Sequence, residues 1–505
     1  MLYPSTSEFL ALCEKGNLIP VYKELAGDLE TPVSAYLKLA RNSKYSFLLE
    51  SVEGEEKIAR YSFLARDPEL IFQSKDRDAQ IIQFQNTEMS KNAVKVVDTP
   101  LSFLREIISQ YRFVTTPGLP RFCGGLVGFM GYDVVRFFEN LPNKPHDDLN
   151  CPDMIFVLAK NLVIFDHLNH KIKVVSCAHV PNKSSQRDRL KVYRAAVDQI
   201  ERTASDLSHA LPEAQTPPTE FNTIPEKFKA RSNLTESQFK LNVTKAKQKI
   251  RAGDIIQVVL SQRFCMGVAT DPLNIYRTLR SVNPSPYMYF LNFDEIQIIG
   301  SSPELLVRCE NGIVETRPIA GTRPRGLDER HDKLLAKDLL SDPKERAEHT
   351  MLVDLGRNDL GRICKKGTVK LSEFMSIEKY SHVMHIVSNV TGKLQHGKDA
   401  FDVLQAAFPA GTVTGAPKIR AMEIIDDLES VARGPYAGAV GYISFSGNLD
   451  TCITIRTIVV NGKKAYIQAG AGIVADSDPK REYLETINKA KAQIMALEMA
   501  HQQTT

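Results

Sequence analysis

The 505-residue sequence lacks the features of a secreted, membrane-bound or nucleic-acid-binding protein. It has no run of about 18 apolar residues, and its first residues lack the basic segment and apolar run of a signal peptide. It also has no long basic block, and 64 basic against 60 acidic residues leave a net charge of +4. We therefore expect neither nucleic acid nor membrane as a partner, and an anionic substrate must be held by a few placed groups.

The eight cysteines give no sign of a metal site or a disulfide framework. No CxxC pair is present, and no two cysteines have the spacing of zinc ligands. We interpret them as reduced thiols and expect a cytoplasmic enzyme.

The clearest break in the chain is the segment 206–232, where Pro, Ser, Thr and charged residues occur without periodicity. It predicts two domains, over residues 1–205 and 233–505, joined by a linker. A helix is expected at 191–204, and another after Thr235–Gln238, which has the form of a capping box.

Hairpin signals join many of the strand-like segments. The polar stretch 167–170 separates two apolar runs, and Asn311-Gly312 and Asn461-Gly462 are typical type I′ turn sequences. Strands joined in this way favour large, mainly antiparallel β-sheets packed as a sandwich with helices on the outside. The predicted fold class is therefore α+β.

Two glutamates are candidate ligands of a hard cation. Glu348 lies one turn beyond Glu345, in a helix that Asp342-Pro343 should begin, and Glu345 fits a capping box there. Glu485 lies four residues before Lys489 in a second helix. On sequence alone, a solvated carboxylate for Glu348 and an exposed salt bridge for Glu485 are the commoner interpretations. Two converging glutamates would suit magnesium, which takes few protein carboxylates.

Two loops and two strand residues are further candidates for binding an anion. The glycines of 469–475 let backbone N–H groups approach a ligand, whereas a dinucleotide fold is excluded because Asp476–Pro479 prevents an immediate helix. The loop 411–418 lacks the ending of a phosphate loop but enters a helix. His385 among valines is ordinarily a core residue, and Arg456 in an apolar strand needs an acidic partner, either structural or on a substrate.

Taken together, these segments resemble those of the chorismate-utilising enzymes over nearly the whole chain. In the second half, the matching stretches include DIIQVVLSQRF, IIGSSPELLVR, TRPIAGTRPRG, AEHTMLVDLGRNDLGR, FPAGTVTGAPK and QAGAGIVADSDP. The first half resembles the regulatory domain of anthranilate synthase large subunits through FLLES at 47–51, ARYSF at 59–63 and FCGGLVGFMGYD at 122–133.

The resemblance implies roles for individual residues. Glu348 and Glu485 would bind Mg²⁺, the expected cofactor. The other active-site positions would be His385, Thr412, Gln257 and Lys489. The residues in contact with chorismate would be Gly321, Thr322, Tyr436, Arg456, Gly470, Ala471 and Gly472. Arg456 and glycine N–H groups would suit one carboxylate of chorismate, and magnesium the other.

Two positions distinguish the members of this family. Ala320 stands where the 4-amino-4-deoxychorismate branch has a lysine nucleophile, and alanine cannot attack the ring. Gln257 stands where isochorismate and salicylate synthases have a lysine that activates water, and glutamine cannot act as that base. The resemblance thus implies a lyase that aminates chorismate at C2 with ammonia and eliminates pyruvate to give anthranilate, the first committed step of tryptophan biosynthesis.

The resemblance also implies partners and regulation. No GxCxG-type nucleophile loop is present, so a separate glutamine amidotransferase subunit would supply ammonia, in a hetero-tetramer. Ser51, Pro286, Tyr287 and Met288 match the positions that bind L-tryptophan as a feedback inhibitor; the alternative is a strand end and a core segment, and the rest of the match favours regulation. The alternatives are aminodeoxychorismate synthase component I, a phenazine-type enzyme that stops at the aminated intermediate, and a non-catalytic tryptophan-binding subunit.

Overall fold

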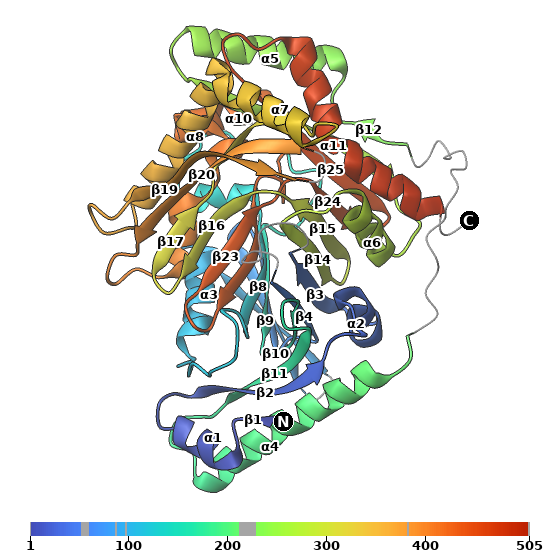
Figure 1. The fold of residues 1–505 in the computed structure, drawn as a ribbon, viewed down its shortest axis with the longest axis vertical. Coiled ribbons are helices and arrows are strands. Elements are labelled where there is room, and N and C mark those ends of the chain that lie inside the picture. The colour runs from blue at the N-terminus through green and yellow to red at the C-terminus, as the bar shows by residue number, and fades with distance from the viewer. Residues whose placement is uncertain are drawn as a thin grey trace.

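The structure is a computed structural model that describes residues 2–51, 60–85, 88–95, 98–211, 229–380 and 383–502. Two large antiparallel sheets form its centre and helices pack around them (Figure 1). The predicted α+β class is therefore confirmed. Residues 212–228, most of the predicted linker, lie outside the described residues. No helix within those residues has the length and apolar character needed to cross a membrane.

The first sheet has 13 strands within the described residues. Twelve of them follow one another in the order β1 (Leu2–Tyr3), β2 (Leu18–Ala26), β11 (Lys171–His179), β10 (Asn161–Asp166), β4 (Tyr61–Arg66), β3 (Tyr45–Glu50), β14 (Tyr287–Phe293), β15 (Ile296–Ser302), β24 (Thr457–Asn461), β25 (Lys464–Ile473), β13 (Gln257–Gly267) and β12 (Arg231–Ser232). The short β21 (Gly415–Ala416) pairs with β13. The sheet passes from the first half of the chain to the second where β3 pairs with β14.

The second sheet has 12 strands in the same described parts of the chain. Its order is β18 (Ile319–Pro324), β20 (Val383–Lys393), β17 (Ile313–Thr316), β16 (Leu305–Glu310), β23 (Leu449–Ile453), β22 (Ala439–Ser444), β8 (Gly125–Met130), β9 (Met154–Ala159), β5 (Leu70–Lys75), β6 (Asp78–Gln85) and β7 (Glu88–Lys95), with β19 (Lys370–Lys379) beside β20. Here the halves join where β8 pairs with β22. Both sheets thus contain strands from both halves, and the division into two domains stays a prediction.

Helices cover the outer faces of the sandwich. Those against the first sheet include α1 (Thr6–Leu12), α2 (Pro32–Leu39), α4 (Gln186–Ser208), α6 (Pro272–Val282) and α11 (Pro479–Gln502). The remaining described helices are α3 (Pro100–Ser109), α5 (Glu236–Arg251), α7 (Glu329–Ser341), α8 (Pro343–Gly361), α9 (Ala400–Ala407), α10 (Lys418–Leu428) and the 3₁₀ turns η1 (Tyr132–Phe137) and η3 (Gly411–Val413).

Aromatic residues fill the space between the two sheets. The rings of Phe63 on β4 and Tyr442 on β22 lie 6.0 Å apart, and those of Phe129 on β8 and Phe293 on β14 lie 6.2 Å apart. All four side chains are buried in one continuous apolar cluster. Burial of such large rings is the main stabilising term of a sandwich core.

Most local predictions hold, and two need correction. Thr235 caps α5 in the predicted capping box, and Asn311-Gly312 forms the predicted turn, with positive φ at both residues. The other hairpin is present, but Asn461 still belongs to the ladder, so the turn lies one residue later. Glu345 does not complete a capping box: its carboxylate instead pairs with Arg323 at 3.2 Å, because a guanidinium from β18 competes with the helix end.

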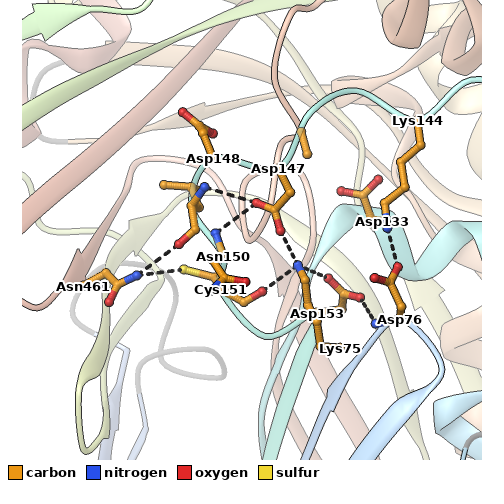
Figure 2. A network of polar contacts seen from close by, with 12 residues as sticks. Lys75, Asp76, Asp133, Lys144, Asp147, Asp148, Asn150, Cys151, Asp153 and Asn461 are labelled. Atoms are coloured by element: carbon orange, nitrogen blue, oxygen red, sulfur yellow. Dashed lines mark hydrogen bonds and ion pairs between the residues drawn. The ribbon is translucent and has the colours of Figure 1, made fainter.

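A loop formed by residues 143–153 ties the two sheets together at one end. Lys75, the last residue of β5, contacts the carboxylates of Asp147 and Asp153 (Figure 2). On the other side, Asn461 of β24 donates a hydrogen bond of 3.2 Å to a backbone carbonyl of the loop. The loop therefore connects β5 of the second sheet with β24 of the first.

Candidate active site

A cavity of about 790 Å³ lies between helices α8 and α11 and the ends of strands from both sheets. This volume is within the range of small-molecule sites. Most residues predicted for catalysis, substrate or metal line it, namely Gln257, Gly321, Thr322, Glu348, His385, Thr412, Tyr436, Arg456, Gly470, Gly472, Glu485 and Lys489. Ala471 does not, because its side chain points to the opposite face of β25 and packs with Val258 and Leu260.

Helix α8 carries Glu348 into the cavity wall. Asp342 caps the helix as predicted, accepting hydrogen bonds from the backbone N–H groups of Lys344 (2.9 Å) and Glu345 (3.2 Å). Within the described residues, no hydrogen bond or ion pair engages the Glu348 carboxylate. Burial raises its pKa, and the negative charges of Glu345 and Glu485 act in the same direction.

Helix α11 contributes Glu485 and Lys489 one turn apart. The Lys489 Nζ atom lies 2.7 Å from Glu485 Oε1 and also donates a hydrogen bond of 3.1 Å to the carbonyl oxygen of Gly470. The i,i+4 salt bridge that the sequence favours is therefore present, but both of its side chains line the cavity.

The acidic side chains in this wall fit a divalent cation. Crowded carboxylates raise the pKa of Glu348, and a bound cation would relieve that repulsion. The described residues contain no group of three or more His, Cys, Asp or Glu side chains placed to hold a metal ion. A cation bound here would have to take most of its ligands from water and substrate, which magnesium does when it binds one or two protein carboxylates.

Arg456 adds a half-buried guanidinium to the wall of the same cavity. It follows β23 in a left-handed conformation with φ of +51°, and no side-chain partner engages it within the described residues. Burial lowers its pKa, with Tyr436 and Glu485 acting in the opposite direction. A partly desolvated guanidinium without a partner is costly, so the cavity is suited to an anionic ligand, above all a carboxylate.

The two glycines of β25 keep the cavity open at its floor. A Cβ atom at Gly470 would lie 2.7 Å from the Tyr436 hydroxyl, and one at Gly472 would lie 3.1 Å from Gln257 Nε2. The Gln257 Oε1 atom is buried without a hydrogen-bond partner. The floor thus combines exposed backbone with an amide group free to bind a ligand.

His385 reaches the cavity from β20. Its Nδ1 atom lies 2.9 Å from the carbonyl oxygen of Gly321 and 3.0 Å from the hydroxyl of Thr322. Because a carbonyl only accepts, Nδ1 carries the proton and Nε2 is left as an acceptor. Burial lowers the pKa of His385, and nearby Arg456 lowers it further, so the ring is neutral at pH 7.

Glu304 is a cavity residue that sequence reasoning missed. It follows β15, and its buried carboxylate accepts a hydrogen bond of 2.6 Å from Thr412. Burial raises the pKa of Glu304 to about 7, while Thr412 and Lys489 act to lower it. An acidic residue directly before the apolar run Leu305–Val307 was the signal available in the sequence. Ala320, predicted to distinguish family members, also lines the cavity.

The predicted tryptophan positions gather in a second, narrow cavity of about 60 Å³ between the sheets. Ser51, Pro286, Tyr287 and Met288 all line it. Beside Ser51, the buried carboxylate of Glu50 accepts hydrogen bonds from Tyr276 and from Arg280 of α6. The Ser51 hydroxyl is buried and has no hydrogen-bond partner among the residues that the structure describes. The lining of this cavity therefore combines apolar and aromatic side chains with charged groups, among them Glu50, Arg308 and Asp450.

Comparison with known proteins agrees with this geometry. Residues 45–495 match the family described as chorismate binding enzyme. The chain is 50% identical to anthranilate synthase component 1 of Acetivibrio thermocellus, over 99% of each chain, and 49% identical to that of Aquifex aeolicus, over 99% of this chain and 98% of the other.

Solved structures extend the comparison to the fold. Anthranilate synthase component I from Streptococcus pneumoniae superposes with a TM-score of 0.74 at 40% identity, covering 93% of this chain and 98% of that one. The menaquinone-specific isochorismate synthase of Escherichia coli, at 19% identity and a TM-score of 0.67, shares the fold. The chain therefore belongs to the chorismate binding enzymes, among the anthranilate synthase component 1 proteins.

Proposed function

We propose that this chain catalyses the magnesium-dependent amination of chorismate at C2 by ammonia, followed by loss of pyruvate, to give anthranilate. The observation that carries the proposal is the presence of two opposite charges, each without a partner, in one cavity. The unpartnered guanidinium of Arg456 and the unpartnered carboxylate of Glu348 both line it. A dianionic ring would bridge them, with one carboxylate on the arginine and the other on a cation.

Glu348 and Glu485 are the residues proposed to hold the magnesium ion. When bound, the ion would neutralise a substrate carboxylate and withdraw charge from the ring that must accept a nucleophile. Lys489, paired with Glu485, fixes that carboxylate and adds a positive charge on the substrate side. Arg456 and the backbone at Gly470 orient the other end of the substrate.

Two residues of the cavity wall, Ala320 and Gln257, bear on the identity of the nucleophile. Ala320 offers no amine, so no covalent adduct with the protein is expected there. Gln257 cannot deprotonate water, but its unpartnered Oε1 atom can accept a hydrogen bond from ammonia. In the first step a C–N bond forms at C2, the ring double bonds shift, and the C4 hydroxyl leaves as water after gaining a proton.

Two groups are suited to move protons. Glu304, with a pKa of about 7, is partly protonated at neutral pH and can donate to the departing hydroxyl. The neutral ring of His385 presents Nε2 as an acceptor. In the second step the C2 proton leaves, the C3–O bond breaks, and the enolpyruvyl carbon gains a proton to become pyruvate.

The proposal includes a partner and a regulator. Relatives are called component 1, which implies a second component. We propose that it is a glutamine amidotransferase that supplies ammonia in a hetero-tetramer in the cytoplasm. The second cavity, lined by Ser51 and by Pro286–Met288, is proposed to bind L-tryptophan as a feedback inhibitor. At about 60 Å³ it must widen to admit an indole ring.

A product assay tests the proposal directly. The chain is incubated with chorismate and an ammonium salt, with and without Mg²⁺, and products are identified by fluorescence and mass. We expect anthranilate and pyruvate in equal amounts, only when Mg²⁺ is present. An aminated product that keeps the enolpyruvyl group would instead favour aminodeoxychorismate synthase or a phenazine-type enzyme. Absence of any turnover would favour a non-catalytic tryptophan-binding subunit.

A further inference from the structure

Arg433 is a fully buried arginine behind the cavity that no catalytic role accounts for. It follows α10 and pairs with Glu429 through two hydrogen bonds of 2.8 and 2.7 Å. The same carboxylate accepts hydrogen bonds of 2.8 Å from the backbone N–H and the hydroxyl of Ser261 on β13. Burying such an ion pair costs free energy, so the pair is a candidate for holding neighbouring groups in position.

Three further contacts of Arg433 go to residues of the cavity wall. It donates hydrogen bonds to the carbonyl oxygens of Val413 (2.7 Å) and Val259 (2.8 Å), and its guanidinium lies 5.5 Å from the ring centre of Tyr436. These three residues come from η3, β13 and the segment before β22, and each lines the cavity. One planar group therefore sets the relative position of three separate walls.

The amino-terminal half completes this arrangement. The guanidinium also lies 4.9 Å from the ring centre of Tyr132, whose backbone N–H donates to the carbonyl oxygen of Gly434 at 2.8 Å. The Tyr132 hydroxyl is buried without a partner, so the ring is the part of the side chain in use. Tyr132 belongs to η1, at the end of the GFMGYD sequence.

We propose that Arg433 is a positioning residue, which together with Tyr132 holds Tyr436, Val413 and Val259 in the geometry that binds the substrate. The inference rests on the proposed function for its readout, because chorismate turnover reports the cavity geometry. A small displacement of such walls costs on the order of 100-fold in rate when reacting groups are misaligned.

The test compares Arg433→Lys with a matched control, Arg136→Lys. Lysine keeps the positive charge beside Glu429. Its single ammonium group cannot donate to both carbonyl oxygens and also contact the two tyrosine rings as the planar guanidinium does. Arg136 also joins the two halves, through its hydrogen bond of 2.8 Å to Asp426, but it does not line the cavity. We expect both variants to lose similar thermal stability, whereas only Arg433→Lys raises KM for chorismate and lowers kcat/KM by roughly 10- to 100-fold.

A second pair of variants keeps the proposal testable if Arg433→Lys does not fold. Tyr132→Leu removes the stacked ring and should shift KM in the same direction, while Tyr132→Phe keeps the ring and should behave as the unaltered chain. Unchanged kcat and KM in Tyr132→Leu, or equal kinetic losses in Arg433→Lys and Arg136→Lys, would overturn the inference. If the unaltered chain turns over no chorismate, the proposed function fails instead, so the two failures are distinguishable.

Discussion

The hydroxyl of Thr412 lies 2.6 Å from the carboxylate of Glu304, although the two residues are 108 positions apart in the sequence. Glu304 has a pKa of about 7, so its protonated, proton-donating form is lost as the pH rises through this value. We expect kcat to fall on the alkaline side of about pH 7. The Glu304→Gln variant should lose roughly 10²- to 10⁴-fold in kcat, the usual contribution of a general acid.

The pH profile checks this role. In Glu304→Gln, the residual rate should no longer fall across the alkaline range, because the titrating group is gone. A Thr412→Val variant should keep the alkaline limb but move it to higher pH, since the hydrogen bond from Thr412 lowers the pKa of Glu304. An unaltered limb in the glutamine variant would assign the titration to another group.

The two candidate magnesium ligands should be individually necessary. Glu348→Gln and Glu485→Gln keep the shape of each side chain but remove its charge, so we expect Mg²⁺-dependent anthranilate formation to fall below detection. Calorimetric titration with Mg²⁺ alone should show weaker binding in both. The control is Glu329→Gln on α7, where an exposed carboxylate pairs only with Lys333. Full activity in either cavity variant would contradict the assignment.

Arg456 should contribute mainly to substrate affinity. Arg456→Lys retains a charge but loses the planar, two-pronged donor that matches a carboxylate. A hydrogen bond to a charged group contributes about 1.5–3 kcal/mol, so KM for chorismate should rise roughly 10- to 100-fold. Arg357→Lys, at an exposed pair on α8, serves as the control. Steady-state kinetics with ammonium decide the matter: a loss confined to kcat would place Arg456 elsewhere than at the substrate.

Gly470 should tolerate no side chain. In Gly470→Ala the new methyl group would lie 2.7 Å from the Tyr436 hydroxyl and 3.0 Å from Val259 Cγ1, so the cavity floor must shift. We expect a loss of chorismate turnover together with a lower melting temperature. Gly361→Ala at the end of α8 meets nothing within 4 Å and should raise the free energy of unfolding by about 0.5–1 kcal/mol. Equal behaviour of the two variants would argue against a tight floor.

The second cavity gives a prediction about regulation. Ser51→Phe places a ring in a cavity of about 60 Å³, so we expect L-tryptophan to lose its inhibition of the enzyme. Ser51→Ala removes only a hydroxyl that has no partner and should weaken inhibition far less. Inhibition curves measured with ammonium as the nitrogen source test both. Unaltered tryptophan inhibition in Ser51→Phe would refute the assignment of this cavity.

Local signals predicted much of the fold. The capping box at Thr235, the cap at Asp342 and the turn at Asn311-Gly312 depend on neighbouring residues, so the sequence contains the whole interaction. Glu345 was predicted wrongly because its partner, Arg323, arrives from another strand. A tertiary ion pair can thus replace the local capping hydrogen bond that the sequence predicts for a charged side chain.

The candidate site shows the same limit. Pattern and family resemblance identified Glu348, Arg456 and His385, but their meeting in one cavity depends on how two sheets and two helices pack. Glu304 was missed because its significance comes from burial and from a distant hydroxyl. A lone acid in a strand-like stretch is ordinary until its surroundings are known.

The β14–β15 hairpin connects the two cavities through residues that face each other in its ladder. Tyr287, in the proposed regulatory cavity, stands directly opposite Ser302 in the ladder. Two residues after Ser302 comes Glu304, whose backbone N–H donates to the Ser302 hydroxyl at 3.4 Å. If a ligand of the second cavity displaces Tyr287, the displacement therefore reaches the peptide that carries Glu304 through a single pair of facing residues.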